Sequence, residues 1–534
     1  MKSRMMVVGL LAVFLSIALG ISALAEDCDN CKYGGTLVLA KSFEPINMST
    51  MKSDYCDMIH AMMSEPPILR DPWGHYVKAG WLESYDVSLD ELVWTFQIKE
   101  GVTFHDGEPL NAEALAWTML ERKARGWRGR HLRFIPEENF KILDEYTLQL
   151  QATAPNPNLL FMLTTPCLYG GMETPNSLER YGEDYGLQMA YGNGPFKLEE
   201  WVRNDHMTFA RNEDYNWAPG FANNDGPAFL ESIKFVFVPE SATRVEMLRT
   251  GEVDGVVDVP FERLEELQNL EGVNILSTPG TAAYFAALNV TKPPLDELKV
   301  RQALSYAIDR ELIAEKIFYG YASPAYSLYL GAKDEMSTTK LMYHYNVAKA
   351  KALLEEAGWV DSNGDGIREK DGDELAFSLW TSNKSEFRRI GEVLQAFWRE
   401  IGADVNLERF DEATLRAKVT NNEHQATIWQ HLWAGLDETM WETNPDNKWY
   451  PNQSGFEPPQ EMLDAQINAA TWEEWLATND ALCNYVQEQA PILRLVRPDS
   501  IMAVRDNFKD IRVREGWWAW LPYFYDVYDA DLCK

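Results

Sequence analysis

Residues 81–120 read WLESYDVSLDELVWTFQIKEGVTFHDGEPLNAEALAWTML, and this stretch decides the fold class. From 93 to 99, the apolar side chains Trp94, Phe96 and Ile98 alternate with Val93, Thr95, Gln97 and Lys99, which is the pattern of a strand with one buried face. Asp106-Gly107 then predicts a turn, because glycine tolerates positive φ. Asn111 is a good N-cap for a helix that continues through Leu120. The stretch therefore predicts strand, turn and helix, the local unit of an α/β protein.

Three strings of the chain resemble one known family. They are FHDGEPL at 104–110, YGNGPFKL at 191–198 and VRQALSYAIDR at 300–310. Together they resemble the family 5 extracytoplasmic solute-binding proteins of ABC importers. That family binds peptides and, in some branches, nickel complexes, opines or oligosaccharides. One departure is visible, because the acid that usually follows the first string falls one place early, at Glu113.

The resemblance implies an α/β fold of the periplasmic-binding-protein type II, cluster C, with two lobes and an extra inserted domain. It implies that a ligand sits between the lobes and that closure about two crossing segments buries it. The expected parts are lobe I from 32–70, 186–283 and 506–534, the inserted domain from 71–185, and lobe II from 284–505.

The N-terminus predicts an export signal. Lys2 and Arg4 precede an apolar run, and small residues at 23–25 predict cleavage after Ala25, so that 1–25 is a signal peptide. Cys28 follows three residues later, whereas a lipoprotein needs a cysteine at once, so we expect no lipid anchor. An uncleaved signal anchor is the alternative. We expect a periplasmic or extracellular protein, since no later run approaches the roughly 18 apolar residues of a membrane span.

The net charge of −33 argues against nucleic acid as a partner, because nucleic acid rewards a basic face. The expected partners are a small organic ligand and the membrane permease of an ABC importer. We expect a monomer and no cofactor.

Six cysteines in an exported chain predict up to three disulfides. Cys28 and Cys31 form a C-x-x-C, for which redox chemistry or half a zinc site is the alternative to a structural disulfide. The lobe assignment implied by the resemblance would bring Cys28 or Cys31 to Cys533.

A polar loop at 361–366 begins like an EF-hand. Asp361, Asn363 and Asp365 supply oxygens at positions 1, 3 and 5, and Gly366 falls at position 6. Position 12 is Gly372, so the bidentate glutamate is missing. Calcium and a plain polar turn both remain open.

Tryptophans crowd the last quarter of the chain, and such flat side chains stack on sugar rings or apolar groups in clefts. In peptide-binding relatives an aspartate three places after such a Trp pairs with the ligand's amino group. Here Leu436 stands at that place after Trp433, and Asp437 comes one residue later, which favours an uncharged oligosaccharide over an oligopeptide. The residues expected to contact the ligand are Trp433, Asp437, Trp429, Tyr284, Trp517 and Trp518.

A secreted carbohydrate-active hydrolase is the alternative function. Its two carboxylates would stand about 5 to 10 Å apart, and 82 acidic residues cannot exclude such a pair. However, the chain contains no G-x-S-x-G and no H-E-x-x-H string. We therefore expect a binding protein and not an enzyme.

Overall fold

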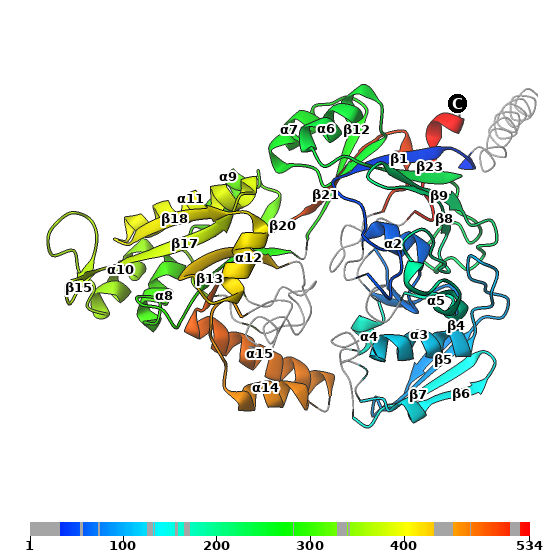
Figure 1. The fold of residues 1–534 in the computed structure, drawn as a ribbon, viewed down its shortest axis with the longest axis horizontal. Helices are drawn as coiled ribbons and strands as arrows, with labels where there is room; N and C mark the ends of the chain where they lie inside the picture. Colours follow the sequence, from blue (N-terminus) through cyan, green and yellow to red (C-terminus); the bar gives the residue numbers. More distant parts are fainter. Residues whose placement is uncertain are drawn as a thin grey trace, which may run out of the picture.

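The computed structural model describes residues 32–53, 57–72, 75–124, 132, 134–154, 159–164, 171–280, 282–327, 339, 342–431, 452–469, 471–512 and 524–533. These residues form two lobes, each built around one mixed sheet, with a smaller antiparallel sheet beside the first lobe (Figure 1). The expectation of an α/β fold is confirmed.

Lobe I is a seven-stranded sheet in the order β12-β21-β11-β1-β10-β9-β8. Its centre is parallel, because β1 pairs with both β10 and β11 in that sense. Leu39 and Ala40 are adjacent in β1 and lie in different hydrophobic clusters, so the sheet is buried on both faces. Helix α2 covers one face, and helices α6 and α7 cover the other. The elements are β1 (Thr36–Lys41), α2 (Met58–Met63), β8 (Phe196–Val202), β9 (His206–Arg211), β10 (Ser232–Phe237), α6 (Ser241–Thr250), β11 (Gly255–Val257), α7 (Leu264–Gln268), β12 (Val273–Thr278) and β21 (Ser500–Arg505).

Lobe II is a six-stranded sheet in the order β14-β20-β13-β19-β17-β18. Helices α8 to α11 bury one face, and α12 and α15 bury the other. The elements are β13 (Ala283–Leu288), α8 (Leu298–Tyr306), α9 (Arg310–Ile317), β14 (Ala322–Pro324), α10 (Val347–Glu356), β17 (Ala376–Ser382), α11 (Ser385–Glu400), β18 (Asp404–Phe410), α12 (Glu412–Thr420), β19 (Ala426–His431), α14 (Gln460–Ile467), α15 (Trp472–Gln489) and β20 (Ile492–Pro498). Three short pairs of described strands lie outside the larger sheets: β2 (Ile68–Arg70) with β3 (Tyr76–Lys78), β15 (Glu369–Lys370) with β16 (Asp373–Glu374), and β22 (Phe508–Lys509) with β23 (Tyr528–Asp529).

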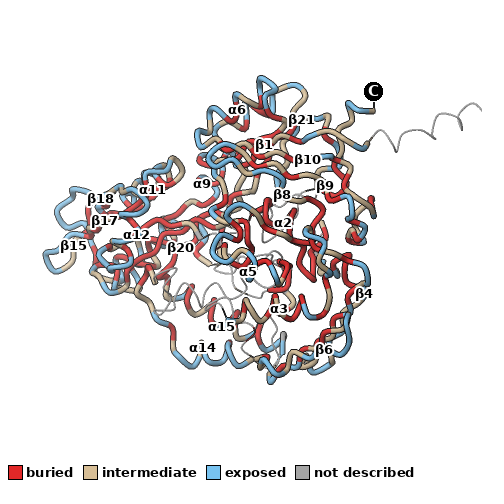
Figure 2. Tube along the Cα trace, turned by 45° about the vertical axis from the view of Figure 1, so that its right-hand side comes forward, coloured by how far each residue is buried: buried red, intermediate tan, exposed pale blue. Residues whose placement is uncertain are grey.

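The third sheet lies in the predicted inserted domain and has the order β4-β5-β7-β6, with every pair antiparallel. Helix α3 packs on it, and the buried residues gather along this contact (Figure 2). The elements are β2 (Ile68–Arg70), β3 (Tyr76–Lys78), β4 (Leu82–Val87), β5 (Val93–Ile98), α3 (Ala112–Ala124), β6 (Phe140–Asp144), β7 (Thr147–Gln151), α4 (Leu159–Met162) and α5 (Pro175–Tyr181).

The described chain crosses between the two large sheets twice. One crossing lies between β12 and β13, and the other is Asp499, between β20 and β21. Residues 500–505 were expected in lobe II, but β21 pairs along its length with β11 and β12 of lobe I. That assignment was wrong because the boundary falls at the single residue between two strands, where no turn dipeptide marks it.

The first two family strings contact each other. His105 of FHDGEPL donates its backbone N–H to the Gly192 carbonyl, and its ring nitrogen Nε2 lies 2.9 Å from the Gly194 carbonyl oxygen. Burial lowers the pKa of His105 to about 3, so the imidazole is neutral. The histidine therefore holds the inserted domain against lobe I.

Candidate functional site

The carboxyl ends of the parallel strands β1 and β11 lie side by side in lobe I, because Ala40 is paired with Val256. Just beyond β11, Phe261 reaches lobe II, where its ring centroid lies 5.0 Å from that of Phe318. In open α/β sheets, ligands bind outside such carboxyl ends. The candidate site is therefore the junction where this edge of lobe I faces lobe II.

A buried ion pair shapes this edge. The Lys41 ammonium lies 3.2 Å from Asp57 Oδ2 and 3.9 Å from Asp258 Oδ2, and it sits over the ring of Phe43. Burial alone would raise the pKa of Asp57, but the Lys41 charge and a hydrogen bond with His60 lower it to about 2. The Asp57 carboxylate is therefore ionised at neutral pH.

Two side chains of this edge are partly exposed. The Asp258 carboxylate is 40% exposed and accepts a 2.6 Å hydrogen bond from Ser42, and Phe43 is 40% exposed. Together they offer an acceptor and an apolar ring. Sequence reasoning missed this edge, although a lysine that ends an apolar strand was a usable signal.

Tyr284 and Trp429, two of the expected ligand contacts, lie on neighbouring strands of lobe II. Tyr284 is 5% exposed and packs between the rings of Phe318 and Phe387, at centroid distances of 5.3 and 5.1 Å. Trp429 is 9% exposed and belongs to the cluster on the opposite face of the sheet, with Trp380. Core packing accounts for both burials, and a direct role in ligand binding stays a prediction for both.

The other four expected contacts, Trp433, Asp437, Trp517 and Trp518, lie outside the described residues. The described chain ends shortly before the first two, at the end of strand β19. Strand β19 ends at His431, which pairs with Ala283, the first residue of β13. Trp433 follows two residues later in the sequence.

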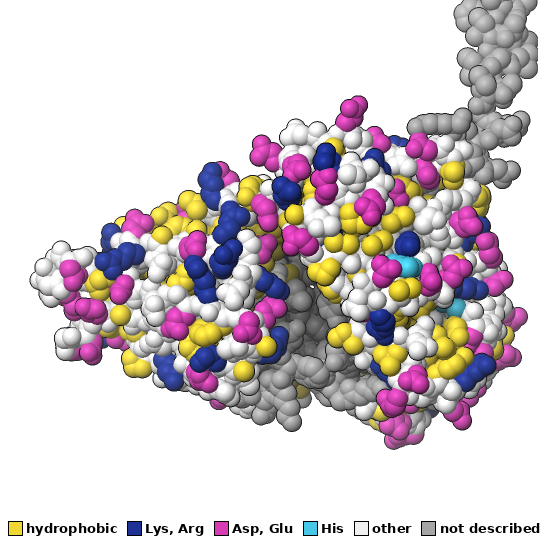
Figure 3. Space-filling view, turned by 45° about the horizontal axis from the view of Figure 1, so that its top comes forward, with side chains coloured by type: hydrophobic (Ala, Val, Ile, Leu, Met, Phe, Trp, Pro, Cys, Tyr) yellow, Lys and Arg dark blue, Asp and Glu magenta, His cyan; other side chains and the backbone are white. Residues whose placement is uncertain are grey.

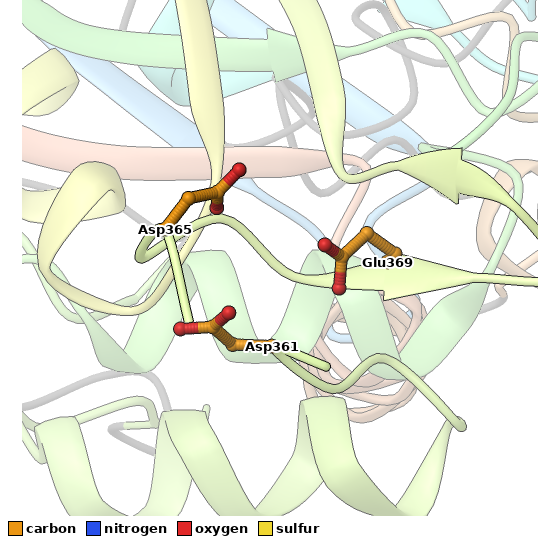
Figure 4. A group of neighbouring side chains, drawn as sticks. All are labelled: Asp361, Asp365 and Glu369. Atoms are coloured by element: carbon orange, nitrogen blue, oxygen red, sulfur yellow. The ribbon is translucent and has the colours of Figure 1, made fainter. Parts of the chain in front are cut away.

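The loop at 361–366 gathers three carboxylates, from Asp361, Asp365 and Glu369, with one oxygen of each within 4.8 Å of the others (Figure 4). Sequence analysis missed Glu369, which falls at position 9 of the loop. The backbone of the loop already forms hydrogen bonds with these carboxylates. The N–H groups of Gly364 and Gly366 donate to the Asp361 carboxylate at 2.7 and 3.1 Å. Asn363 accepts from Asp365 N–H, so the polar turn accounts for this geometry, and calcium binding stays a prediction.

Two cysteines lie among the described residues. Cys483 is a buried thiol in the core of lobe II, and Cys533 is disulfide-bonded. Cys28 and Cys31, the expected partners of Cys533, lie outside the described residues. The pairing therefore stays a prediction.

The sequence profile of the bacterial extracellular solute-binding proteins, family 5 (middle region), matches residues 77–450. The chain belongs to this family. Among curated relatives, the glutathione-binding protein GsiB of Salmonella typhimurium is 28% identical over 479 residues, which cover 85% of this chain and 86% of GsiB. The corresponding protein of Escherichia coli O1:K1 is 27% identical over 473 residues, covering 84% of this chain and 85% of the relative.

Solved structures share the fold. The oligopeptide-binding protein AppA from Bacillus subtilis, solved with a nonapeptide, is 20% identical with a TM-score of 0.72, covering 93% of this chain and 99% of AppA. NikA from Brucella suis, solved with Fe(III)-EDTA, is 21% identical with a TM-score of 0.80, covering 93% of this chain and 100% of NikA. The expected two-lobed periplasmic-binding-protein fold is confirmed.

The family assignment fixes the general role. The protein is an extracytoplasmic solute-binding protein of the kind that serves ABC importers. No helix among the described residues is long and apolar enough to cross a membrane. On the face in Figure 3, acidic and basic side chains are interspersed over both lobes. The predicted signal peptide, residues 1–25, lies outside the described residues.

Proposed function

We propose that the protein captures a short peptide or peptide-like solute between its lobes and delivers it to the membrane permease of an ABC importer. The alignment with GsiB carries this proposal, because it runs through 85% of this chain and 86% of the relative. None of the relatives named above is described as binding a sugar, and none is a hydrolase. The preference for an oligosaccharide rested on Leu436 and Asp437, which lie outside the described residues, so we replace it.

Capture would work by closure of the lobes about the two crossings, 279–282 and Asp499. The exposed Asp258 carboxylate and Phe43 ring would face the solute from lobe I, and Trp433 and Asp437 would face it from lobe II. Trp517 and Trp518 would complete the site. A carboxylate suits a peptide's ammonium group, and aromatic rings suit its apolar side chains.

The remaining parts of the proposal concern the mature chain. We propose that it begins after Ala25, carries no lipid anchor, works as a monomer, and joins Cys28 or Cys31 to Cys533. The inserted domain would comprise residues 71–185. Non-reducing peptide mapping tests the disulfide, and pairing of Cys533 with Cys167 would contradict it.

Mass spectrometry of the solute that co-purifies from the native host tests the ligand class. A thermal-shift panel then compares glutathione, dipeptides, a nonapeptide, nickel–histidine and oligosaccharides, because a ligand at a hundred times its Kd stabilises by about 2.7 kcal/mol. We expect a peptide in the first experiment and stabilisation by a peptide in the second. A sugar or a metal chelate as the sole ligand would contradict the proposal, and conversion of the solute into products would favour the hydrolase.

A further inference from the structure

Lobe II touches the inserted domain at a place far from the crossings. Trp475 of α15 is 4% exposed and belongs to the hydrophobic cluster at the core of the inserted domain. Leu476 of the same helix and Ala469, just after α14, pack against that cluster. Helix α4 supplies Leu159 and Met162 to it. Residues from two parts that the fold builds separately therefore share one core.

The two ends of α15 lie in different cores. Its second half contributes Leu482, Cys483 and Val486 to the cluster on one face of the lobe II sheet. Trp475, Leu482 and Val486 are seven and four residues apart, so they share one face of the helix. At 1.5 Å per residue, the 18-residue helix is about 27 Å long, long enough to bridge the two cores.

Helix α14 is fastened to α15. The buried Asn479 of α15 accepts a 2.7 Å hydrogen bond from the buried Gln466 of α14. Buried amides that pair with each other are costly to separate, so the two helices form one unit.

The distance of this contact from the crossings determines how strongly it opposes opening of the lobes. The described chain joins the lobes between β12 and β13 and between β20 and β21, and Figure 1 shows the step from β20 to β21 near the middle of the molecule, with α14 and α15 below it at the lower edge. A rotation about the crossings separates the lobes most at the point farthest from them. A contact at that point must break before the lobes open.

We propose that α14 and α15 form a clasp, in which Trp475 docks on the inserted domain and holds the ligand-free protein toward the closed state. In this proposal Trp475 does not contact the solute. It is a positioning residue, because it affects solute capture by holding lobe II against the inserted domain. The proposal rests on the proposed function only in assuming that the lobes move. It differs from that function in being testable without any ligand.

The experiment compares Trp475→Ala with Tyr485→Ala in ligand-free protein. Tyr485 is a matched control, because it is a half-buried aromatic residue of the same helix whose ring lies 6.1 Å from Phe456 within lobe II. Hydrogen–deuterium exchange and small-angle scattering report on the full-length chain. For Trp475→Ala we expect about tenfold faster exchange at residues 159–164 of the inserted domain and a larger radius of gyration.

Three further outcomes are informative. Tyr485→Ala should leave exchange at 159–164 unchanged, and Trp475→Phe should restore most of the protection. If Trp475→Ala fails to fold, Leu476→Ser makes the same comparison. Faster exchange confined to α14 and α15, with the radius of gyration and residues 159–164 unchanged, would overturn the clasp while leaving solute capture intact.

Discussion

Glu65 is a buried carboxyl group where lobe I, the inserted domain and the C-terminal tail meet. The Tyr525 hydroxyl donates to its Oε1 at 2.6 Å, and the Tyr215 hydroxyl donates to the same oxygen at 3.2 Å. Burial raises the pKa of Glu65 to about 8, against the lowering effect of the two tyrosines. The group is therefore largely protonated in the folded protein at neutral pH.

This carboxyl predicts a pH-dependent stability. Its folded pKa lies above the ordinary glutamate value of 4.5, so the folded state holds a proton that the unfolded state has lost between about pH 4.5 and 8. Stability should fall as pH rises through this window, by on the order of 1 kcal/mol per pH unit. Glu65→Gln should remove this slope, whereas Glu113→Gln, an exposed change on α3, should not. Urea unfolding from pH 5 to 9 measures it, and equal slopes in wild type and Glu65→Gln would refute the assignment.

Comparing substitutions of Trp433 and Trp398 distinguishes a loss of ligand binding from a loss of core packing. Trp398 is fully buried and donates its indole N–H to the Leu304 carbonyl at 3.0 Å. Trp398→Ala should cost about 3 to 5 kcal/mol of stability with little change in affinity. Trp433→Ala should cost about 2 kcal/mol of binding, roughly thirtyfold in Kd, with little change in melting temperature. Calorimetry on both variants decides, and the Trp398 pattern in the Trp433 variant would place Trp433 in the core.

At the scale of elements, a single side chain can mark where a helix starts, and the N-cap predicted at Asn111 is confirmed. Asn111, Asp309 and Asn346 each accept a backbone N–H at the start of a helix, at 3.0, 2.9 and 2.9 Å. Helix α6 spans 241–250, and Gly251, which follows it, has a φ of 81°. These features depend on a few adjacent residues, which is why the sequence alone reveals them.

Helix α15 shows where sequence reasoning failed. Its buried face includes Asn479 between Trp475 and Leu482, and the Oδ1 of that amide accepts its hydrogen bond from Gln466 of α14. A polar residue inside an apolar stripe weakens the helical period, and its partner is a tertiary contact. The same limit hid the Lys41–Asp57 pair, whose members are brought together by the packing of α2 on β1.

Gly80 joins the inserted domain to lobe I, and its close contact predicts a specific cost. A Cβ at Gly80 would lie 1.8 Å from the Trp217 carbonyl oxygen and 2.4 Å from that of Ala218. Because both atoms are backbone, Gly80→Ala should destabilise the protein by about 3 kcal/mol. Gly220→Ala is the matched control, since nothing lies within 4 Å of its Cβ. Thermal unfolding compares them, and equal melting temperatures would contradict the close packing.

At the scale of the whole molecule, the two lobes were predicted from the resemblance of the family strings. Hydrophobic periodicity and turn signals did not predict them. One core, shared by the inserted domain, both lobes and the C-terminal tail, collects buried residues from Ile68 to Tyr525, including Trp217 and Trp475. No periodicity links segments so far apart in the chain. The candidate site has the same origin, because its edge in lobe I and its strands in lobe II meet only in the folded protein.

The central claim is that the two lobes close around a peptide-like solute, and small-angle scattering tests it most directly. The protein is first unfolded and refolded to remove any bound solute, and is then measured with and without the peptide identified by mass spectrometry. Closure about the two crossings should reduce the radius of gyration when the peptide is added, and the reduction should be larger in Trp475→Ala, in which the clasp no longer holds the ligand-free lobes together. An unchanged radius of gyration in both proteins at saturating concentrations of a peptide that calorimetry shows to bind would contradict the account.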